Sequence, residues 1–252
     1  MDKVLDAAVE AARAAGAVAL QHYRGRLEVT LKPDQSPVTQ ADREAERVIV
    51  ETLRARFPEY GFLGEELGAA GSSEVRWIID PIDGTRNFVR GIPIWAVLIA
   101  LEEHGEVTAG VILNPVTRDL HTARKGQGAF VNGEPIRVST VTELKDAHLV
   151  YSGLDLIRRC AQWDGFLRLV DFTSRARGFG DYLTYTVLAE GKAEIAVEVD
   201  LKPWDLAPLK ILVEEAGGHF TDFAGRPSVY SGSALATNGR LHEEALALLS
   251  GR

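Results

Sequence analysis

The sequence predicts an α/β layered fold made of two fused lobes, each with a sheet covered by helices. Three observations support this prediction. The 252 residues are 46% hydrophobic and 25% charged, enough apolar surface for one large core or two joined lobes. Up to about residue 140, two long helical patterns precede a series of short strands, and beyond it strands and helices alternate. We expect an N-terminal lobe over residues 1–140 and a C-terminal lobe over 141–252, neither of which folds alone.

The N-terminal lobe is expected to begin with two helices. Residues 3–22 are alanine-rich with apolar residues at helical spacing, and Gly25 ends this helix. Thr39 followed by Asp42 resembles a capping box, which predicts a second helix that runs to about Phe57, before Pro58. Between the helices, residues 27–31 are expected to form a short strand and the Pro-containing stretch 32–37 a loop. The buried faces are expected at Val4, Ala8, Ala11, Ala15, Val18 and Ala19 in the first helix and at Ala41, Ala45, Val48, Ile49 and Leu53 in the second.

Strands follow up to residue 140. The short strand 61–64 carries Glu65 and Glu66 at its end, and a mobile loop of small residues is expected from there through Ser73. The apolar run Trp77-Ile78-Ile79 predicts a strand that ends at Asp80. Further strands of an antiparallel sheet are expected at 94–101, 107–113, 120–122, 129–131 and 136–138, with a hairpin loop at 102–106.

The C-terminal lobe is expected to alternate strands and helices. Gly191 and the pair Gly217-Gly218 are typical of helix ends. Strands are expected at 148–151, 172–175, 195–198, 219–221 and 235–237, and helices at 162–170, 181–190, 205–216 and 240–250.

The stretch Asp80-Pro81-Ile82-Asp83-Gly84-Thr85 is the centre of the functional prediction. Pro81 cannot continue a ladder, so the chain is expected to turn there, with Asp80 and Asp83 converging on one point. Gly84 allows close approach to a ligand, and Thr85 can cap a short helix whose N–H groups attract an anion. Two carboxylates beside an anion-binding turn favour a hard cation such as Mg²⁺, with a phosphate as the anion. A turn without a ligand would leave two unpaired buried carboxylates, which is costly.

Other carboxylates stand at the ends of predicted elements. Glu65 and Glu66 end a strand, Asp42 lies in the first turn of the second helix, and Asp205 begins a later helix. Each has a purely structural interpretation: the aspartates as acids that complement the helix dipole, the glutamates as a solvated strand end. Taken together, they are several carboxylates placed where elements stop and a site can form.

Composition argues against several classes of function. The formal net charge is −8, and no run of Lys or Arg indicates a nucleic-acid or membrane surface. The single cysteine, Cys160, cannot form an internal disulfide, which fits a cytoplasmic protein. The N-terminus has no apolar core of signal-peptide length, and no stretch is as apolar as a membrane span. Nucleophile-elbow, P-loop and zinc motifs are absent from the sequence.

At this point the chain resembles the inositol monophosphatase family, the Mg²⁺-dependent phosphatases that include fructose-1,6-bisphosphatase. The matching stretches occur in the family's order and cover nearly the whole chain. They are Val38-Thr39-Gln40-Ala41-Asp42, Gly64-Glu65-Glu66, residues 77–85, Trp204-Asp205-Leu206-Ala207 and Glu215-Ala216-Gly217-Gly218. The resemblance implies the family's αβαβα sandwich and a homodimer that acts on a small phosphorylated metabolite.

The resemblance also implies roles for individual residues. Glu65, Asp80 and the carbonyl of Ile82 would hold one Mg²⁺, and Asp80, Asp83 and Asp205 a second, with a third, weaker ion near Glu65. Whether two or three ions act together is left open. Thr85, hydrogen-bonded to Asp42, would orient the attacking water, and Glu65 would help to take its proton. The Gly84 and Thr85 amides would hold the phosphate for in-line hydrolysis.

Within the family, residues 86–95 and 177–185 look more like the histidinol-phosphate phosphatases than the inositol monophosphatases. An aspartate, Asp181, follows Gly180 where the inositol enzymes have serine. By position, Glu198 matches a contact to a substrate hydroxyl and Arg177 a substrate-binding arginine. The resemblance thus places the substrate against Asp83, Gly84, Thr85, Arg177, Gly180, Asp181, Glu198 and Asp205. Extra carboxylates would favour a substrate with an ammonium and an imidazole over a neutral polyol.

Three alternatives remain open. Asp181 is equally well explained as a cap of the helix that follows it. The substrate can be inositol 1-phosphate, or a range of sugar and polyol phosphates. The chain can also be a non-catalytic metal-binding regulatory or RNA-associated protein with the same fold, although the intact set of Glu65, Asp80, Asp83, Thr85 and Asp205 argues for catalysis.

Overall fold

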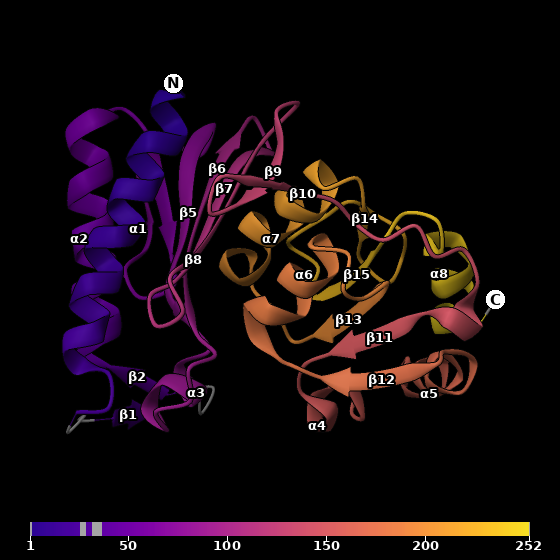
Figure 1. Cartoon of the computed structure of the whole chain (residues 1–252). Helices are drawn as coiled ribbons and strands as arrows, with labels where there is room; N and C mark the ends of the chain where they lie inside the picture. The colour runs from indigo at the N-terminus through magenta and orange to yellow at the C-terminus, as the bar shows by residue number, and fades with distance from the viewer. Residues whose placement is uncertain (1, 26–28, 32–36, 252) are drawn as a thin grey trace.

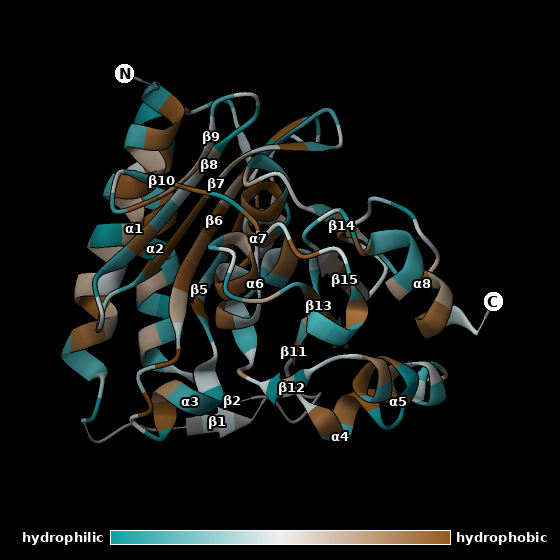
Figure 2. Ribbon diagram, turned by 45° about the vertical axis from the view of Figure 1, so that its right-hand side comes forward, coloured by the Kyte–Doolittle hydropathy of each residue, from teal (hydrophilic) through white to brown (hydrophobic). Residues whose placement is uncertain are grey.

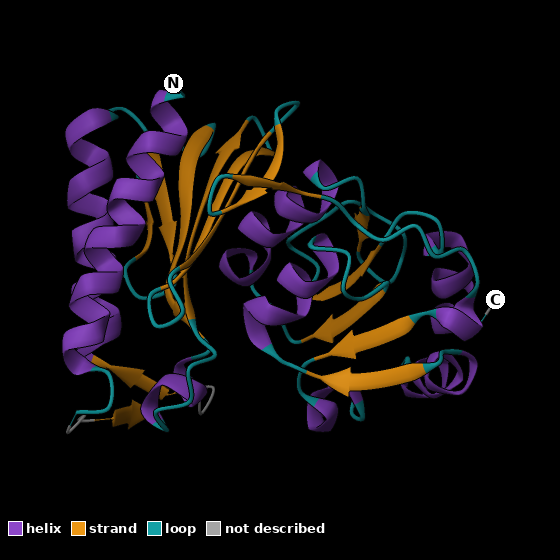
Figure 3. Cartoon of the chain, in the orientation of Figure 1, coloured by secondary structure: helices purple, strands orange, loops and turns teal. Residues whose placement is uncertain are grey.

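The computed structural model describes residues 2–25, 29–31 and 37–251, and its helices and sheets alternate in five layers (Figure 1). Helices α1 (Lys3–His22) and α2 (Gln40–Arg56) cover the outer face of an eight-stranded sheet. Helices α6 (Asp181–Ala189) and α7 (Pro203–Glu215) lie between this sheet and a five-stranded one. Helices α4 (Leu154–Ile157), α5 (Trp163–Phe172) and α8 (His242–Ser250) form the last layer (Figure 3). The layered α+β fold expected from the sequence is confirmed.

The eight-stranded sheet takes all its strands from residues 61–136. Its order is β10-β9-β8-β7-β6-β5-β3-β4, antiparallel except for the parallel pair β3 and β5. Its strands are β3 (Gly61–Gly64), β4 (Gly68–Ala70), β5 (Val75–Asp83), β6 (Ala96–Glu103), β7 (Glu106–Asn114), β8 (Asp119–Arg124), β9 (Gly128–Val131) and β10 (Glu134–Ile136). A separate hairpin pairs β1 (Val29–Leu31) with β2 (Pro37–Thr39).

The five-stranded sheet takes its strands from residues 148–237, in the order β12-β11-β13-β15-β14. Strands β12, β11 and β13 are parallel, and β15 is antiparallel to β13 and β14. A short 3₁₀ helix (Leu144–Asp146) precedes the sheet, whose strands are β11 (His148–Tyr151), β12 (Arg175–Gly178), β13 (Ile195–Val199), β14 (His219–Thr221) and β15 (Ser233–Thr237). Since the two sheets divide near residue 140, we propose that the two lobes meet there.

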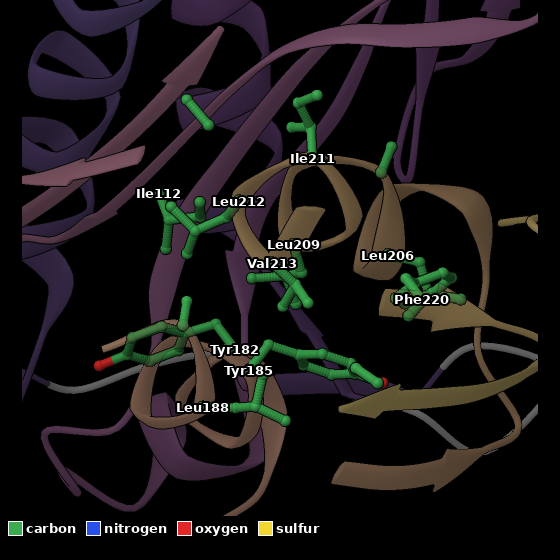
Figure 4. Close-up of a cluster of buried hydrophobic side chains, with 14 of the residues drawn as sticks. Ile112, Tyr182, Tyr185, Leu188, Leu206, Leu209, Ile211, Leu212, Val213 and Phe220 are labelled. Atoms are coloured by element: carbon green, nitrogen blue, oxygen red, sulfur yellow. The ribbon is translucent and has the colours of Figure 1, made fainter. Parts of the chain in front are cut away.

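The largest buried cluster lies between the two sheets and joins the lobes (Figure 4). Side chains of α6 and α7, such as Tyr185 and Leu212, pack there with Ile112 of β7. The contact with α7 is close: a Cβ on Gly110 of β7 would lie 2.6 Å from Ile211 Cγ2 and 2.8 Å from the Pro208 carbonyl. Burying this shared surface stabilises both lobes at once, which supports the expectation that neither folds alone.

The helical faces follow from the alanine-rich pattern. The alanines of α1 pack in a second cluster with Ile49 and Leu53 of α2 and with the outer face of β5–β7. Figure 2 shows hydrophobic colour along these strands and mixed colours along both helices. Val48 lies only half-buried, at the edge of the predicted inner face. No helix in the described ranges has the length and apolar character needed to cross a membrane.

Three local predictions are wrong, and one short helix was not predicted. The loop after Glu66 contains β4, which pairs with β3 through its backbone although all its small side chains are exposed. The strand expected at 172–175 lies at 175–178, because α5 continues through Phe172. Pro81 does not end its strand: two residues of β5, Pro81 and Ile82, face one of β6, so the proline occupies a bulge that needs no ladder donor. The short helix α4 was not expected.

The rest of the described chain follows the prediction closely. The strand expected at 27–31 and the loop at 32–37 fall partly outside the described residues, and Pro37 itself begins β2. Elsewhere the element types agree, and the bounds differ by a few residues.

Candidate active site

Parallel strands of both sheets end at one cleft between the lobes. The carboxyl ends of β3 and β5 supply Glu65 and the residues from Asp80 to Thr85. Strands β11, β12 and β13 approach from the other lobe and end at Ser152, Gly178 and Glu198. Helix α7 contributes Asp205 near its N-terminus, and the cleft has a volume of about 610 Å³. Ligand sites of α/β sheets form at such carboxyl ends.

Asp80, Asp83 and Asp205 form a compact group of carboxylates. Each offers an oxygen, and the three oxygens lie within 4.8 Å of one another. Backbone N–H groups orient all three side chains. Ile82 donates to Asp80 Oδ1 at 2.9 Å, Tyr182 to Asp83 Oδ2 at 2.6 Å, and Lys202 to Asp205 Oδ2 at 2.7 Å. Asp205 is therefore both a capping acid of α7 and part of the group, so its two sequence-based interpretations hold together.

The electrostatics of this group fit a bound divalent cation. Burial, together with the neighbouring carboxylates Glu65, Asp83 and Asp205, raises the pKa of Asp80 well above its ordinary value. Burial and the charges of Asp181 and Asp205 do the same for the pKa of Asp83. The pKa of Asp205 rises to about 7, mainly through burial. Within the described chain no cation pairs with the three aspartates, whose oxygens are the ligand type that Mg²⁺ prefers.

Thr85 and Asp42 meet beside the group of Asp80, Asp83 and Asp205. Thr85 Oγ1 lies 3.0 Å from the Ile82 carbonyl and 3.3 Å from Asp42 Oδ1. Asp42 also accepts from the Thr39 N–H at 2.8 Å, which completes the predicted capping box of α2. Burial raises the pKa of Asp42 to about 6, against the opposing hydrogen bonds from Thr39. The expectation that Thr85 caps helix α3 (Thr85–Val89) is wrong, because Gly84 is the N-cap residue and no side chain caps it.

Gly84 forms the turn between Asp83 and α3. Its φ of 83° is left-handed, and a Cβ there would lie 2.9 Å from the Ile94 carbonyl and 3.1 Å from Asp181 Oδ2. Only glycine fits this position. The first N–H groups of the turn precede the intrahelical bonds, which begin with Asn87 donating to the Gly84 carbonyl at 2.9 Å. Gly84 and Thr85 line the cleft, and N–H groups without an intrahelical acceptor suit an anion.

Asp181 and Glu198 of the second lobe also line the cleft, and Asp181 approaches the Gly84 turn. Asp181 Oδ2 accepts from Asn87 Nδ2 at 2.7 Å, and among the described hydrogen bonds it accepts none from its own helix. The capping interpretation of Asp181 is therefore not supported. Glu198 is 4% exposed, and its Oε2 has no partner among the described atoms. Burial raises the pKa of Glu198 to about 8. A hydrogen bond with Ser152 lowers this pKa, and the charge of Asp181 raises it further.

The structure brings most of the predicted site residues together but not Arg177. Gly180 lines the cleft beside Asp181, whereas Arg177 is exposed on the edge strand β12, where its Nη1 donates to the Ala176 carbonyl at 3.4 Å. Asp42 lies behind the cleft and reaches it through Thr85.

The structure adds lining residues that sequence reasoning did not single out. Asn87, Asp155 and Asp200 line the cleft, as does the half-exposed ring of Phe179. Asn87 lies two residues after the central motif and inside the stretch 86–95 that carried the family resemblance, but neither signal singled it out. Among the described residues, the lining has eight carboxylates and one basic side chain, that of Arg86.

Comparison with known proteins agrees with the resemblance. The model of the inositol monophosphatase family matches residues 1–251. The chain is 44% identical over 230 residues to a histidinol-phosphatase of Mycobacterium tuberculosis, covering 89% of this chain and 88% of the relative. It is 41% identical over 251 residues to a histidinol-phosphatase of Streptomyces coelicolor, covering 96% and 94%. A Nus factor SuhB of Xylella fastidiosa is 39% identical over 224 residues, covering 86% and 81%.

Two solved structures share the fold over nearly their full length. The extragenic suppressor protein SuhB of Bartonella henselae superposes with a TM-score of 0.91 at 36% identity, covering 98% of each chain. An inositol monophosphatase of Thermotoga maritima superposes with a TM-score of 0.88 at 35% identity, covering 100% of this chain and 98% of that one.

Proposed function

Because the chain belongs to the inositol monophosphatase family of phosphoric monoester hydrolases, we propose that it is the Mg²⁺-dependent histidinol-phosphatase. The reaction is the hydrolysis of L-histidinol phosphate to L-histidinol and phosphate. The observation that carries the metal requirement is the group of Asp80, Asp83 and Asp205, whose buried oxygens converge without a cation among the described residues. The observation that favours this substrate is the acidic lining of the cleft.

Five groups would hold the Mg²⁺ ions. They are the carboxylates of Glu65, Asp80, Asp83 and Asp205 and the carbonyl of Ile82, all at the cleft. When bound, the ions would supply the positive charge that neutralises the phosphate and activates water. Two or three ions per site are consistent with this donor set.

The chain's own residues would position the reacting groups. The amides of Gly84 and Thr85 would bind the phosphate oxygens at the left-handed turn. The Thr85 hydroxyl, directed by Asp42 and the Ile82 carbonyl, would orient the attacking water, and Glu65 would accept its proton. Hydrolysis then depends on positioning and charge neutralisation rather than on a covalent intermediate.

The second lobe would recognise the leaving group. Glu198 presents an unpartnered carboxylate oxygen from the end of β13, and Asp155, Asp181 and Asp200 line the same side of the cleft. Histidinol carries an ammonium group and an imidazole, and such groups gain from nearby carboxylates where a neutral polyol does not. The two histidinol-phosphatase relatives support this choice.

The test is a phosphate-release assay on purified protein, with L-histidinol phosphate and inositol 1-phosphate as substrates. We expect turnover that disappears with EDTA, returns with Mg²⁺, and has a higher kcat/KM for L-histidinol phosphate. Equal or reversed preference would favour the inositol phosphatase alternative. Absence of metal-dependent turnover on any phosphomonoester would favour a non-catalytic role, which the SuhB relative keeps open.

The proposal includes a cytoplasmic homodimer acting on a free metabolite, without nucleic acid or membrane as partner. The net charge of −8 and the single half-buried Cys160 support it. Light scattering behind a sizing column tests the dimer: a mass near that of one chain would exclude it.

A further inference from the structure

A buried glutamate, Glu46, holds the turn that carries Glu65. Glu46 lies on α2, is 0% exposed, and no described cation pairs with it. Its Oε2 accepts from the Glu66 N–H at 2.8 Å and its Oε1 from the Leu67 N–H at 3.0 Å. The backbone of Glu65 itself donates to the Ile79 carbonyl of β5 at 3.2 Å. Three successive N–H groups of the turn 65–67 are therefore fixed, two of them by one side chain.

Gly64 shows how closely the carboxylate fits. An ideal Cβ at Gly64 would lie only 1.8 Å from Glu46 Oε1 and 2.7 Å from its carboxyl carbon. Any side chain at position 64 would displace the Glu46 carboxylate from the turn. The close approach of the Glu46 carboxylate to the turn therefore requires glycine at position 64.

The position of Glu46 on α2 relates it to the site. Asp42 and Glu46 are one helical turn apart, and both are buried. Asp42 contacts Thr85, which follows β5, and Glu46 contacts the turn of Glu65, which follows β3. One face of α2 therefore supports two parts of the cleft that come from different strands.

We propose that Glu46 is a positioning residue for metal binding, which acts by fixing the turn 65–67 and so the direction from which Glu65 enters the site. This inference rests on the proposed Mg²⁺-dependent function. Mg²⁺ demands near-ideal ligand geometry, so a small displacement of Glu65 weakens binding even when every ligand is still present. Glu46 itself touches neither substrate nor metal.

The experiment compares substitutions of the two partners with a matched control. Glu46→Gln keeps the shape but turns an NH₂ group toward a backbone N–H, and Gly64→Ala pushes the carboxylate aside. The control is Glu194→Gln: Glu194 is also buried and accepts from a backbone N–H, that of His148 at 2.6 Å. It precedes β13 at the end opposite Glu198 and so lies away from the cleft.

Two quantities are measured: Mg²⁺ affinity by calorimetry without substrate, and the Mg²⁺ concentration for half-maximal phosphate release. We expect Glu46→Gln and Gly64→Ala to weaken both by about 10- to 100-fold. Glu194→Gln should leave the Mg²⁺ affinity and the half-maximal Mg²⁺ concentration within about twofold of wild type, because it removes no support from a metal ligand. Its thermal midpoint should fall about as much as those of Glu46→Gln and Gly64→Ala. In a Glu46→Ala background, adding Gly64→Ala should change Mg²⁺ affinity by less than about twofold. The carboxylate that a Cβ at position 64 displaces is already absent from that variant.

Unchanged Mg²⁺ affinity in the variants of Glu46 and Gly64 that fold would overturn this inference alone, as would an equal loss in Glu194→Gln. If Glu46→Gln does not fold, Gly64→Ala gives the same answer, since it leaves the glutamate in place. A wild-type protein that neither binds Mg²⁺ nor releases phosphate would overturn the proposed function and this inference with it.

Discussion

Thr85 Oγ1 lies 3.3 Å from Asp42 Oδ1, so the hydroxyl that follows the Gly84 turn contacts a buried carboxylate of α2. The hydroxyl carries one hydrogen, which it can donate either to Asp42 or to the Ile82 carbonyl 3.0 Å away. Under the proposed function, ionised Asp42 would accept this hydrogen and leave the Thr85 lone pairs for the attacking water. Protonated Asp42 is a poorer acceptor, and Thr85 then turns to Ile82.

The first prediction concerns the acid limb of activity. At saturating Mg²⁺ the metal-binding carboxylates stay ionised, so the fall in kcat at low pH should follow Asp42, whose pKa burial raises to about 6. We expect Asp42→Asn to lower kcat about 100-fold at pH 8 and to remove this limb. The measurement is a pH profile of kcat for wild type and Asp42→Asn. If the fall at low pH persists in Asp42→Asn, another group causes it.

The second prediction concerns stability without metal. Asp80, Asp83 and Asp205 have pKa values raised by burial and by neighbouring carboxylates, so between about pH 4 and pH 7 the folded protein binds more protons than the unfolded chain. The stability that protonation provides is complete below about pH 4 and is lost as pH rises through these folded-state pKa values. With EDTA, the thermal midpoint should fall from pH 5 to pH 8. Mg²⁺ should restore it most at pH 8, and a midpoint insensitive to metal at pH 8 would argue against the site.

The third prediction separates stability from activity at Asp80. Asp80→Asn keeps the shape and the oxygen that accepts from the Ile82 N–H, but removes one charge from the group. In EDTA at pH 8 its thermal midpoint should rise by about 2–4 °C, roughly 1 kcal/mol of relieved repulsion. Its kcat/KM should fall about 1,000-fold or more. Calorimetry and phosphate release on the same preparation test this, and loss of both stability and activity would indicate a purely structural aspartate.

The fourth prediction concerns the choice of substrate. Asp181→Ala should lower kcat/KM for L-histidinol phosphate about 10-fold more than for a phosphate ester with a small neutral leaving group. The substitution removes a carboxylate from the side of the cleft that is proposed to bind the leaving group. Arg177→Ala is the matched comparison, since Arg177 is exposed and outside the cleft lining. Equal losses on both esters in Asp181→Ala would place its role in phosphate release instead.

How much of the fold the sequence predicted depended on the kind of sequence pattern. Long periodic segments such as α1 and β7 were found from their pattern, and the central motif placed Asp80 and Asp83 correctly beside each other. Strand β4 was missed because its Gly-Ala-Ala sequence has no alternation: backbone pairing alone makes it a strand. Sequence reasoning treated Pro81 as a terminator, since it could not foresee the bulge that accommodates the ring.

The candidate site was harder to predict from the sequence where its contacts join residues of different elements. Sequence reasoning did not single out Glu46, and only the fold shows that its carboxylate reaches the turn of Glu65. Arg177 was placed by position in a motif, but the register of β12 leaves its side chain exposed. Spacing along the chain predicts which residue types gather at an element's end; packing decides which of them face the cleft.

The most direct test of the account is diffraction from crystals soaked in Mn²⁺, collected at a wavelength where manganese scatters anomalously. The account predicts at least one anomalous peak bounded by the carboxylates of Asp80, Asp83 and Asp205. A protein that hydrolyses phosphate esters in EDTA, with no peak among these carboxylates at saturating Mn²⁺, would contradict it.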